Sequence, residues 1–395
     1  MRGTIKNYLN QFDLDIRKTR DARFMDQKCT PDVICFIADC IMNLVNKNQP
    51  FTVNDIWKSQ YFIKNTRAIF NKPWATDLRA RHEYDKFIQQ PLRMLAYANI
   101  LEITKKGNVN HYKISNEEIL DYISQRERNT YNFLYCYFEK VLTDSGFWRY
   151  FLDYKNSNQT KEDFNSLKER YTRFIIGHTA INGVVEVHRI FPKILNVFAV
   201  ENQLKGSEKG RVSKYVFTFS DLMYNRKNWR DLNKEKSITR QEAEISEQEI
   251  MQQEAYNAYY VQKAIALIRK IHKESEVKDQ WAIGEATQVH HIFSRAEFPE
   301  IAHYIENLIL LTPTQHYTKA HPSNKTQQVN KDYQLICLLA KADTIEKSLR
   351  QIGEKYYRKE SFIYVISIGL NENIELKLSF PEIKTKLIHI YNNIA

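Results

Sequence analysis

The run Val289-His290-His291-Ile292-Phe293 and the later run Glu306-Asn307-Leu308-Ile309-Leu310-Leu311-Thr312-Pro313-Thr314-Gln315-His316 decide the fold of the C-terminal part of this chain. The apolar residues at 289–292 and 308–311 predict two short strands, and residues 293–306 predict a loop with a short helical piece. The Thr-Pro-Thr sequence at 312–314 offers an N-cap and a proline for the start of a helix. The predicted order is therefore strand, loop, strand, helix.

Histidines are concentrated in this stretch. Five of the eleven histidines of the chain lie between residues 289 and 321. Hydrolysis of a phosphodiester needs an activated water, a cation beside the phosphate and help for the leaving oxygen. An imidazole titrates near neutral pH, so it can take a proton from water. An adjacent histidine pair alone means little, and His303 is expected to be a surface or packing residue. The spacing of His290, His291, Asn307 and His316 within the predicted elements indicates a metal-dependent nuclease.

At these residues the chain resembles the HNH nucleases of the ββα-metal class, and its local sequence is most similar to that of HNH-type restriction endonucleases. The resemblance covers about 35 residues of 395. It implies that His291 is the general base and that His290 and His316 are metal ligands. It also implies that Asn307 holds the loop between the strands and so fixes the tautomer of His291. The implied one-metal mechanism leaves 5′-phosphate and 3′-hydroxyl ends.

Two departures from the family pattern bear on which metals this chain is expected to bind. Many HNH domains carry Cys-x-x-Cys before the last histidine, whereas this chain has Thr312 and Gln315, so no structural zinc is expected. The position of His290 is often aspartate, and an imidazole there shifts the site toward transition metals. Mg²⁺ is the first expectation for the working ion, with Mn²⁺ or Zn²⁺ as alternatives.

Three more polar residues flank the predicted site. His321 follows His316 by five residues, which on an α-helix places it about 140° away from the ligand face. His321 is therefore expected to be a phosphate contact or a structural residue. Lys319 and Arg295 are further candidates for phosphate contacts, although each alone is more simply a solvated charge.

The N-terminal part, from Thr30 to Gln125, predicts three helices followed by a hairpin about a Lys-Gly-Asn turn. One helix is expected to start after Thr30 and end near Asn48, a short one lies near Phe51 to Trp57, and the third runs from about Glu83 to Ala98. This order resembles a winged helix, whose third helix enters the major groove. The expected DNA contacts are Lys86, Gln89, Gln90, Arg93, Lys105, Lys106 and Asn108. The alternatives are a winged helix for protein contacts, or a plain α+β packing unit.

The middle of the chain is expected to be helical, aromatic and basic. Residues 204–240 hold ten Lys or Arg against four acids, and Gly206 and Gly210 suggest a hairpin near the start. The mixed basic and aromatic run at 224–230 suits a sugar-phosphate surface through Arg226, Lys227 and Arg230, although a solvated face explains it equally well. A polar helix at about 239–271 is expected to be a spacer or a dimer-forming arm.

The whole chain is predicted to be an α+β, mainly helical protein of three parts: a winged-helix-like DNA-recognition domain at 1–125, a helical DNA-wrapping region at 126–275, and an HNH nuclease domain with a helical extension at 276–395. The net charge of +11 favours a polyanionic partner such as DNA, although a generally basic composition explains it as well. Five scattered cysteines without a C-x-x-C pair predict reduced thiols. The absence of a long apolar run predicts a cytoplasmic protein without a membrane partner.

These features together lead to one functional hypothesis and two rivals. The leading hypothesis is a site-specific double-stranded DNA endonuclease of type II restriction, acting as a homodimer and genetically paired with a DNA methyltransferase. One rival is a less specific HNH nuclease of a mobile element or toxin. The other is a winged-helix DNA-binding regulator in which the histidines hold a structural metal.

Overall fold

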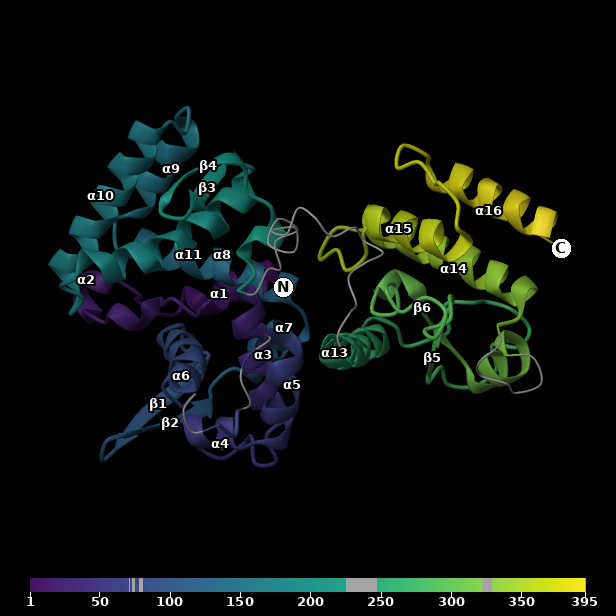
Figure 1. The fold of residues 1–395 in the computed structure, drawn as a ribbon, viewed down its shortest axis with the longest axis horizontal. Helices are drawn as coiled ribbons and strands as arrows, with labels where there is room; N and C mark the ends of the chain where they lie inside the picture. The colour runs from purple at the N-terminus through teal and green to yellow at the C-terminus, as the bar shows by residue number, and fades with distance from the viewer. Residues whose placement is uncertain (71, 73–74, 78–80, 225–246, 322–328, 395) are drawn as a thin grey trace. The chain divides into compact units, whose positions relative to one another are not determined.

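The computed structural model describes residues 1–70, 72, 75–77, 81–224, 247–321 and 329–394 (Figure 1). The chain divides into two compact units, an N-terminal unit from Met1 to Ile245 and a C-terminal unit from Ser246 to Ala395. Both are mainly helical, and their strands form short antiparallel pairs. None of the described helices is long and apolar enough to cross a membrane.

The N-terminal unit is an assembly of helices with two hairpins. Its elements in chain order are α1 (Arg2–Leu9), α2 (Ile16–Thr19), η1 (Ala22–Phe24), α3 (Pro31–Met42), α4 (Val53–Trp57), α5 (Gln60–Phe70), α6 (Arg81–Tyr97), β1 (Leu101–Lys106), β2 (Val109–Ile114), α7 (Glu117–Gln125), α8 (Glu127–Asp144), α9 (Trp148–Asn156), α10 (Lys161–His178), α11 (Val184–Asn202), β3 (Lys205–Glu208), β4 (Arg211–Val216) and η3 (Phe219–Leu222).

Helix α3 lies at the centre of this unit because it is apolar on nearly all sides. It begins at Pro31, where the missing N–H of proline costs no helical hydrogen bond, and it packs against α6, α7 and α8. The helix ends at Met42, earlier than its apolar pattern predicts. The side chain of Asn43 donates to the carbonyl of Asp39 at 2.9 Å, and Val45 is 98% exposed. The residues after 42 therefore do not continue the core face.

The predicted third helix and hairpin are confirmed as α6 and the pair β1–β2. Leu101 pairs with Ile114 and Lys106 with Val109, and Gly107 takes a positive φ of 58° in the turn. The hairpin extends beyond the helices of its unit (Figure 1). Phe51 adds an antiparallel bridge to Tyr112. Helix α5 was not anticipated from the sequence.

The C-terminal unit surrounds one strand pair with helices. Its elements are α13 (Glu247–Ile271), β5 (Gln288–His291), η4 (Ile305–Asn307), β6 (Leu308–Leu311), the π-helical segment η5 (Gln315–Ala320), α14 (Lys331–Arg350), α15 (Lys359–Leu370) and α16 (Phe380–Ile394). All four residues of β6 are buried, and α13 packs against β5, β6 and η4. The predicted order of strand, loop, strand and helix is confirmed.

The compact units divide the chain differently from the three predicted domains. Residues 1–125 do not form a separate body, because α3 and α7 pack on α8. The long helix α13 belongs to the C-terminal unit, where Val261, Leu267 and Ile268 are buried. The boundary therefore falls at residues 245–246. The sequence predicts that this helix is a spacer or a dimer-forming arm. In the structure α13 instead forms part of the core around the strand pair.

Candidate metal centre

Strand pairing places the histidine pair of β5 directly beside the buried strand β6. In the antiparallel register His290 faces Ile309 and His291 faces Leu308. The other edge of β6 is held by Glu276, whose backbone N–H donates to the Leu310 carbonyl at 3.0 Å and whose Oε1 accepts the Leu310 N–H at 2.9 Å. Strand β6 is thus held at both edges, by β5 and by Glu276, and it gives the two histidines of β5 a rigid support.

The π-helical segment η5 and the residue that directly follows it supply two more histidines. His316 lies inside this segment, and His321 follows its last residue with an extended backbone (φ −117°, ψ 114°). The hydrogen bonds of a π-helix join residues five apart, so such residues lie near one face. The N–H of Asn330 donates to the Ala320 carbonyl at 2.9 Å and fixes the end of the turn.

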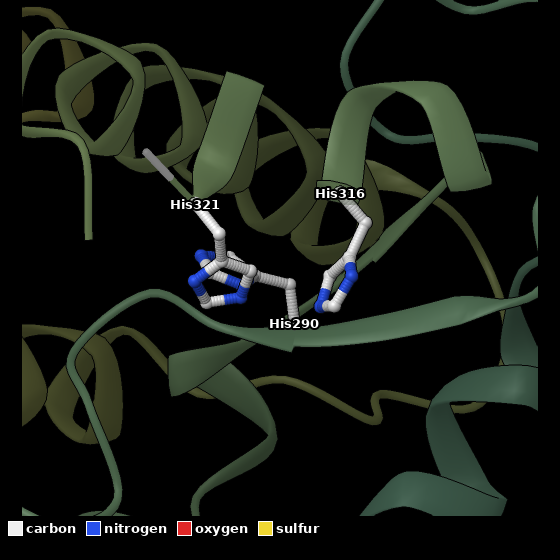
Figure 2. A group of neighbouring side chains, drawn as sticks. All are labelled: His290, His316 and His321. Atoms are coloured by element: carbon white, nitrogen blue, oxygen red, sulfur yellow. The ribbon is translucent and has the colours of Figure 1, made fainter. Parts of the chain in front are cut away.

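His290, His316 and His321 converge into one cluster, which we call the histidine trio (Figure 2). One ligand atom from each ring lies within 4.8 Å of those from the other two. The ring centres are 5.4 Å apart for His290 and His316, 4.9 Å for His290 and His321, and 4.7 Å for His316 and His321. The structure therefore brings together the two expected ligands, and it corrects the expectation that His321 points away from them.

The trio has the properties of a metal site. His290 Nε2 and His316 Nδ1 are buried and have no hydrogen-bond partner, an arrangement that costs free energy unless the lone pairs are used. Burial, together with the neighbouring histidines, holds the pKa of His290 well below its usual value, and burial with His321 lowers the pKa of His316 to about 4. Neutral imidazoles are the form that binds a metal ion.

His291 lines the same cavity but is not a member of the trio. Its Nε2 lies 3.1 Å from the carbonyl oxygen of Ala302. Because a carbonyl only accepts, Nε2 carries the proton and Nδ1 keeps its lone pair. Burial also lowers the pKa of His291 and keeps the ring neutral. The side chain is thus prepared to accept a proton at Nδ1.

Asn307 fixes the loop that carries this carbonyl. Its Oδ1 accepts the Phe293 N–H at 2.8 Å, and its Nδ2 donates to the carbonyls of Phe293 at 3.1 Å and Ile301 at 3.3 Å. The side chain is completely buried. The loop-holding role expected for Asn307 agrees with this geometry, but the tautomer of His291 is set by Ala302. Every residue type has a backbone carbonyl, so the sequence does not predict the contact between Ala302 and His291.

Gln315 organises a buried hydrogen-bond network before η5. Its Oε1 accepts from the Thr312 N–H at 3.0 Å and the Ser275 hydroxyl at 2.6 Å. Its Nε2 donates to the Val277 carbonyl and to Asp279 Oδ1, both at 2.9 Å. The amide therefore joins the turn before η5 to the segment 275–279 without a metal.

Replacement of Gln315 by alanine is expected to lower the free energy of unfolding of the C-terminal unit by about 2–3 kcal/mol, because it leaves buried donors and acceptors without partners. Chemical denaturation of the full chain in the presence of a chelator measures this change. Gln351 is an exposed helix-capping residue of the same unit, so Gln351→Ala is the matched control. Equal denaturation midpoints for the two variants would contradict the assigned role of Gln315.

The flanking basic residues lie at different places. Arg295 is exposed and lines a cavity of about 480 Å³. His291 and the three histidines of the trio line the same cavity. The Nζ of Lys319 lies 3.9 Å from the ring centre of Trp281, in a cation–π contact. Of the two basic side chains expected to contact phosphate, Arg295 therefore lies beside the site, whereas Lys319 stacks on the indole ring of Trp281.

The residues expected to contact DNA in the N-terminal unit are only partly available. Lys105, Lys106 and Asn108 are exposed on the β1–β2 hairpin, and Lys86 and Gln89 are exposed on α6. Arg93 instead pairs with Asp21 at 3.4 Å, and Gln90 Oε1 accepts the Lys28 N–H at 2.8 Å. Arg226, Lys227 and Arg230 lie outside the described residues.

Comparisons of the chain with protein-family models, with curated proteins and with solved structures gave no significant match. The functional interpretation below therefore depends on the geometry of the site itself.

Proposed function

We propose that this protein is a metal-dependent DNA endonuclease of HNH type, with its active site at the histidine trio. The observation that carries the proposal is the position of His291: it lines the cavity of the trio, stays outside the trio, and has Nδ1 kept unprotonated by the bond from Nε2 to Ala302. A purely structural metal site has no use for an oriented base beside it.

The donor set supports a transition metal over magnesium. Within the part of the chain that the structure describes, the cluster consists of three imidazoles and includes no carboxylate. Imidazole nitrogen suits zinc, copper, iron or nickel, whereas magnesium prefers oxygen ligands. When bound, such an ion would supply positive charge to stabilise the transition state of phosphodiester hydrolysis.

The residues of the chain account for the remaining steps of hydrolysis. His291 Nδ1 takes the proton of the attacking water, and the Ala302 carbonyl stabilises the imidazolium that forms through the Nε2–H bond. Arg295, at the rim of the cavity, holds a non-bridging phosphate oxygen. Asn307 keeps Ala302 in place through the loop. Breakage of the bond between phosphorus and the 3′ oxygen, which takes a proton from solvent water, then leaves a 5′-phosphate and a 3′-hydroxyl.

The N-terminal unit supports a DNA substrate through its exposed basic hairpin. Lys105, Lys106 and Asn108 surround the turn at Gly107, where they are available to the sugar-phosphate backbone of a duplex. The hairpin, and not α6, is therefore the part of the winged-helix-like arrangement that contacts the duplex. A homodimer would cut both strands in a restriction reaction, and a DNA methyltransferase would protect the host DNA.

Incubation of the purified protein with plasmid DNA tests the proposed activity. Reactions with Mn²⁺, Ni²⁺, Zn²⁺ or Mg²⁺ are compared with a reaction in chelator. Discrete fragments with any of these ions, absent in chelator, support a site-specific enzyme, and a smear supports a less specific nuclease. Binding of DNA without scission under all these conditions would instead select the regulator with a structural metal.

His321 distinguishes the trio from a two-histidine site. Removal of one of three ligands in His321→Ala is expected to weaken metal binding by at least about tenfold. Titration calorimetry with Ni²⁺ or Zn²⁺ measures the change, with Lys319→Ala as a control from the same segment. If His321 were only a phosphate contact, metal affinity would stay at the level of the unmodified protein and DNA affinity alone would fall.

A further inference from the structure

A second cavity of about 480 Å³ lies in the N-terminal unit, among η1, α6 and α11. Its lining is polar and includes Arg23, Lys86, Gln89, Gln90, Arg93 and Arg189. The volume is within the range of small-molecule sites. This cavity is separate from the histidine trio, which belongs to the C-terminal unit.

The cavity has more positive charge than its own carboxylates neutralise. The carboxylates of the lining, Asp26 and Glu186, both pair with Arg23, at 2.6 Å and 3.7 Å. Arg93 pairs with Asp21, outside the lining, at 3.4 Å. Within the described residues, by contrast, Lys86 on α6 and Arg189 on α11 form no ion pair or hydrogen bond, and both are exposed. Two uncompensated cations, one on α6 and one on α11, suit an anion such as a phosphate group, for which arginine is a preferred partner.

Glutamine amides provide the second kind of contact. Gln27, Gln89 and Gln90 all line the cavity. The Oε1 of Gln90 accepts the backbone N–H of Lys28 at 2.8 Å, which orients the NH₂ group of the same amide. A carboxamide presents one donor and one acceptor in a plane, and it can pair with the edge of a nucleobase through both. The cavity therefore combines groups for a phosphate with groups for a base.

The surroundings of α6 restrict the size of the ligand. A helix that reads the major groove needs free space on both flanks, because the groove is about 12 Å wide. Here the face with Gln89, Gln90 and Arg93 is walled by η1 and α11. A single nucleotide suits this half-open cavity better than an intact duplex does.

We propose that this cavity binds one nucleotide, with its phosphate on Lys86 and Arg189 and the edge of its base on Gln89 and Gln90. The nucleotide is either free or part of a DNA strand, because both sources present the same phosphate and base. The inference depends on the N-terminal unit alone, and it holds whether or not the histidine trio supports hydrolysis.

Binding to the full chain in chelator tests the proposal, because cleavage is then absent. The probes are the four deoxynucleoside 5′-monophosphates, inorganic phosphate, a short single-stranded oligonucleotide and a duplex of the same sequence, all measured by titration calorimetry. We expect saturable binding of a mononucleotide or of the oligonucleotide, at least about tenfold tighter than that of inorganic phosphate. Binding of the mononucleotide indicates a free ligand, and binding of strand-borne nucleotides alone indicates DNA as the source.

Variants assign any binding to this cavity. Arg189→Ala and Lys86→Ala are each expected to weaken binding by about tenfold or more, since each removes a charge-assisted contact. Gln89→Ala is expected to reduce the difference in affinity among the four bases. Arg173→Ala, a change at an exposed arginine of α10, is the matched control and should leave binding unchanged. Thermal unfolding verifies that all four variants are folded.

Three outcomes would overturn the proposal: no binding of any nucleotide probe, binding of inorganic phosphate as tight as that of a nucleotide, or equal affinities for Arg189→Ala and Arg173→Ala. His290→Ala separates this inference from the nuclease proposal, because that change removes the trio and should leave nucleotide binding unaltered. A loss of cleavage in His290→Ala with normal nucleotide binding would support both proposals independently.

Discussion

His291→Ala is expected to reduce the rate of DNA cleavage by about 10²–10⁴-fold, the contribution typical of a positioned general base. The histidine trio does not include His291, so affinity for Ni²⁺ or Zn²⁺ should remain at the level of the unmodified protein. The bond to Ala302 is lost, but the loop keeps its three bonds to Asn307. Cleavage rates under single-turnover conditions and metal titrations of the same preparation measure the two effects.

The separation of these two effects is the informative result. His389 is an exposed histidine of α16, so His389→Ala controls for the loss of an imidazole elsewhere in the same unit. Added imidazole is expected to restore part of the activity of His291→Ala, because the deletion leaves space in the cavity. If His291→Ala cleaves DNA at the rate of His389→Ala, His291 is not the base.

Lys341→Met is expected to destabilise the C-terminal unit by about 3–5 kcal/mol, the usual effect of breaking a buried ion pair. The Nζ of Lys341 lies 2.6 Å from Glu276 Oε2, and the two side chains are 0% and 2% exposed. Glu276 also accepts the Leu310 N–H, so loss of its partner reaches the edge of β6. Hydrogen exchange of the β6 amides in chelator measures the opening free energy of this strand.

A double variant tests whether the unpaired carboxylate of Glu276 causes the loss of stability in Lys341→Met. Glu276→Gln combined with Lys341→Met keeps an oxygen for the Leu310 N–H and removes the uncompensated charge, so most of the lost stability should return. Lys278→Met breaks the exposed pair with Glu274 and should leave the exchange of β6 unchanged. A double variant as unstable as Lys341→Met alone would show that packing of the lysine stem is responsible.

The sequence predicted the local elements of the C-terminal site well, because apolar runs and a Thr-Pro start are local signals. The strand Leu308–Leu311 has its predicted bounds, and Asn307 lies at its start as expected. The position of His321 differs from the expected one because 100° per residue holds for an α-helix, whereas residues 315–320 form a π-helix and His321 is extended. Neither feature has a local marker in the sequence. Ala302 contributes only a backbone carbonyl, which any residue type supplies.

Tertiary packing was harder to predict than the elements themselves. The sequence of α13 predicts a polar spacer or dimer-forming arm, whereas its C-terminal half carries Val261, Leu267 and Ile268 into the core. On α6, the side chains that were assigned to the major groove line a walled cavity, since α11 contributes Glu186 and Arg189 from about a hundred residues away in the sequence. Periodicity identifies which face of a helix is polar, but it does not show what covers that face.

The amide network of Gln315 has a consequence for how this protein responds to its surroundings. Where a zinc ion holds the turn before the last histidine, removal of metal unfolds the domain and exposes it to proteolysis. Here the turn is held by hydrogen bonds of Gln315 with Ser275, Val277 and Asp279, so its fold does not depend on a metal ion at the trio. If the proposed function is correct, loss and return of the ion would switch activity off and on in a persistent protein pool, without unfolding or new synthesis.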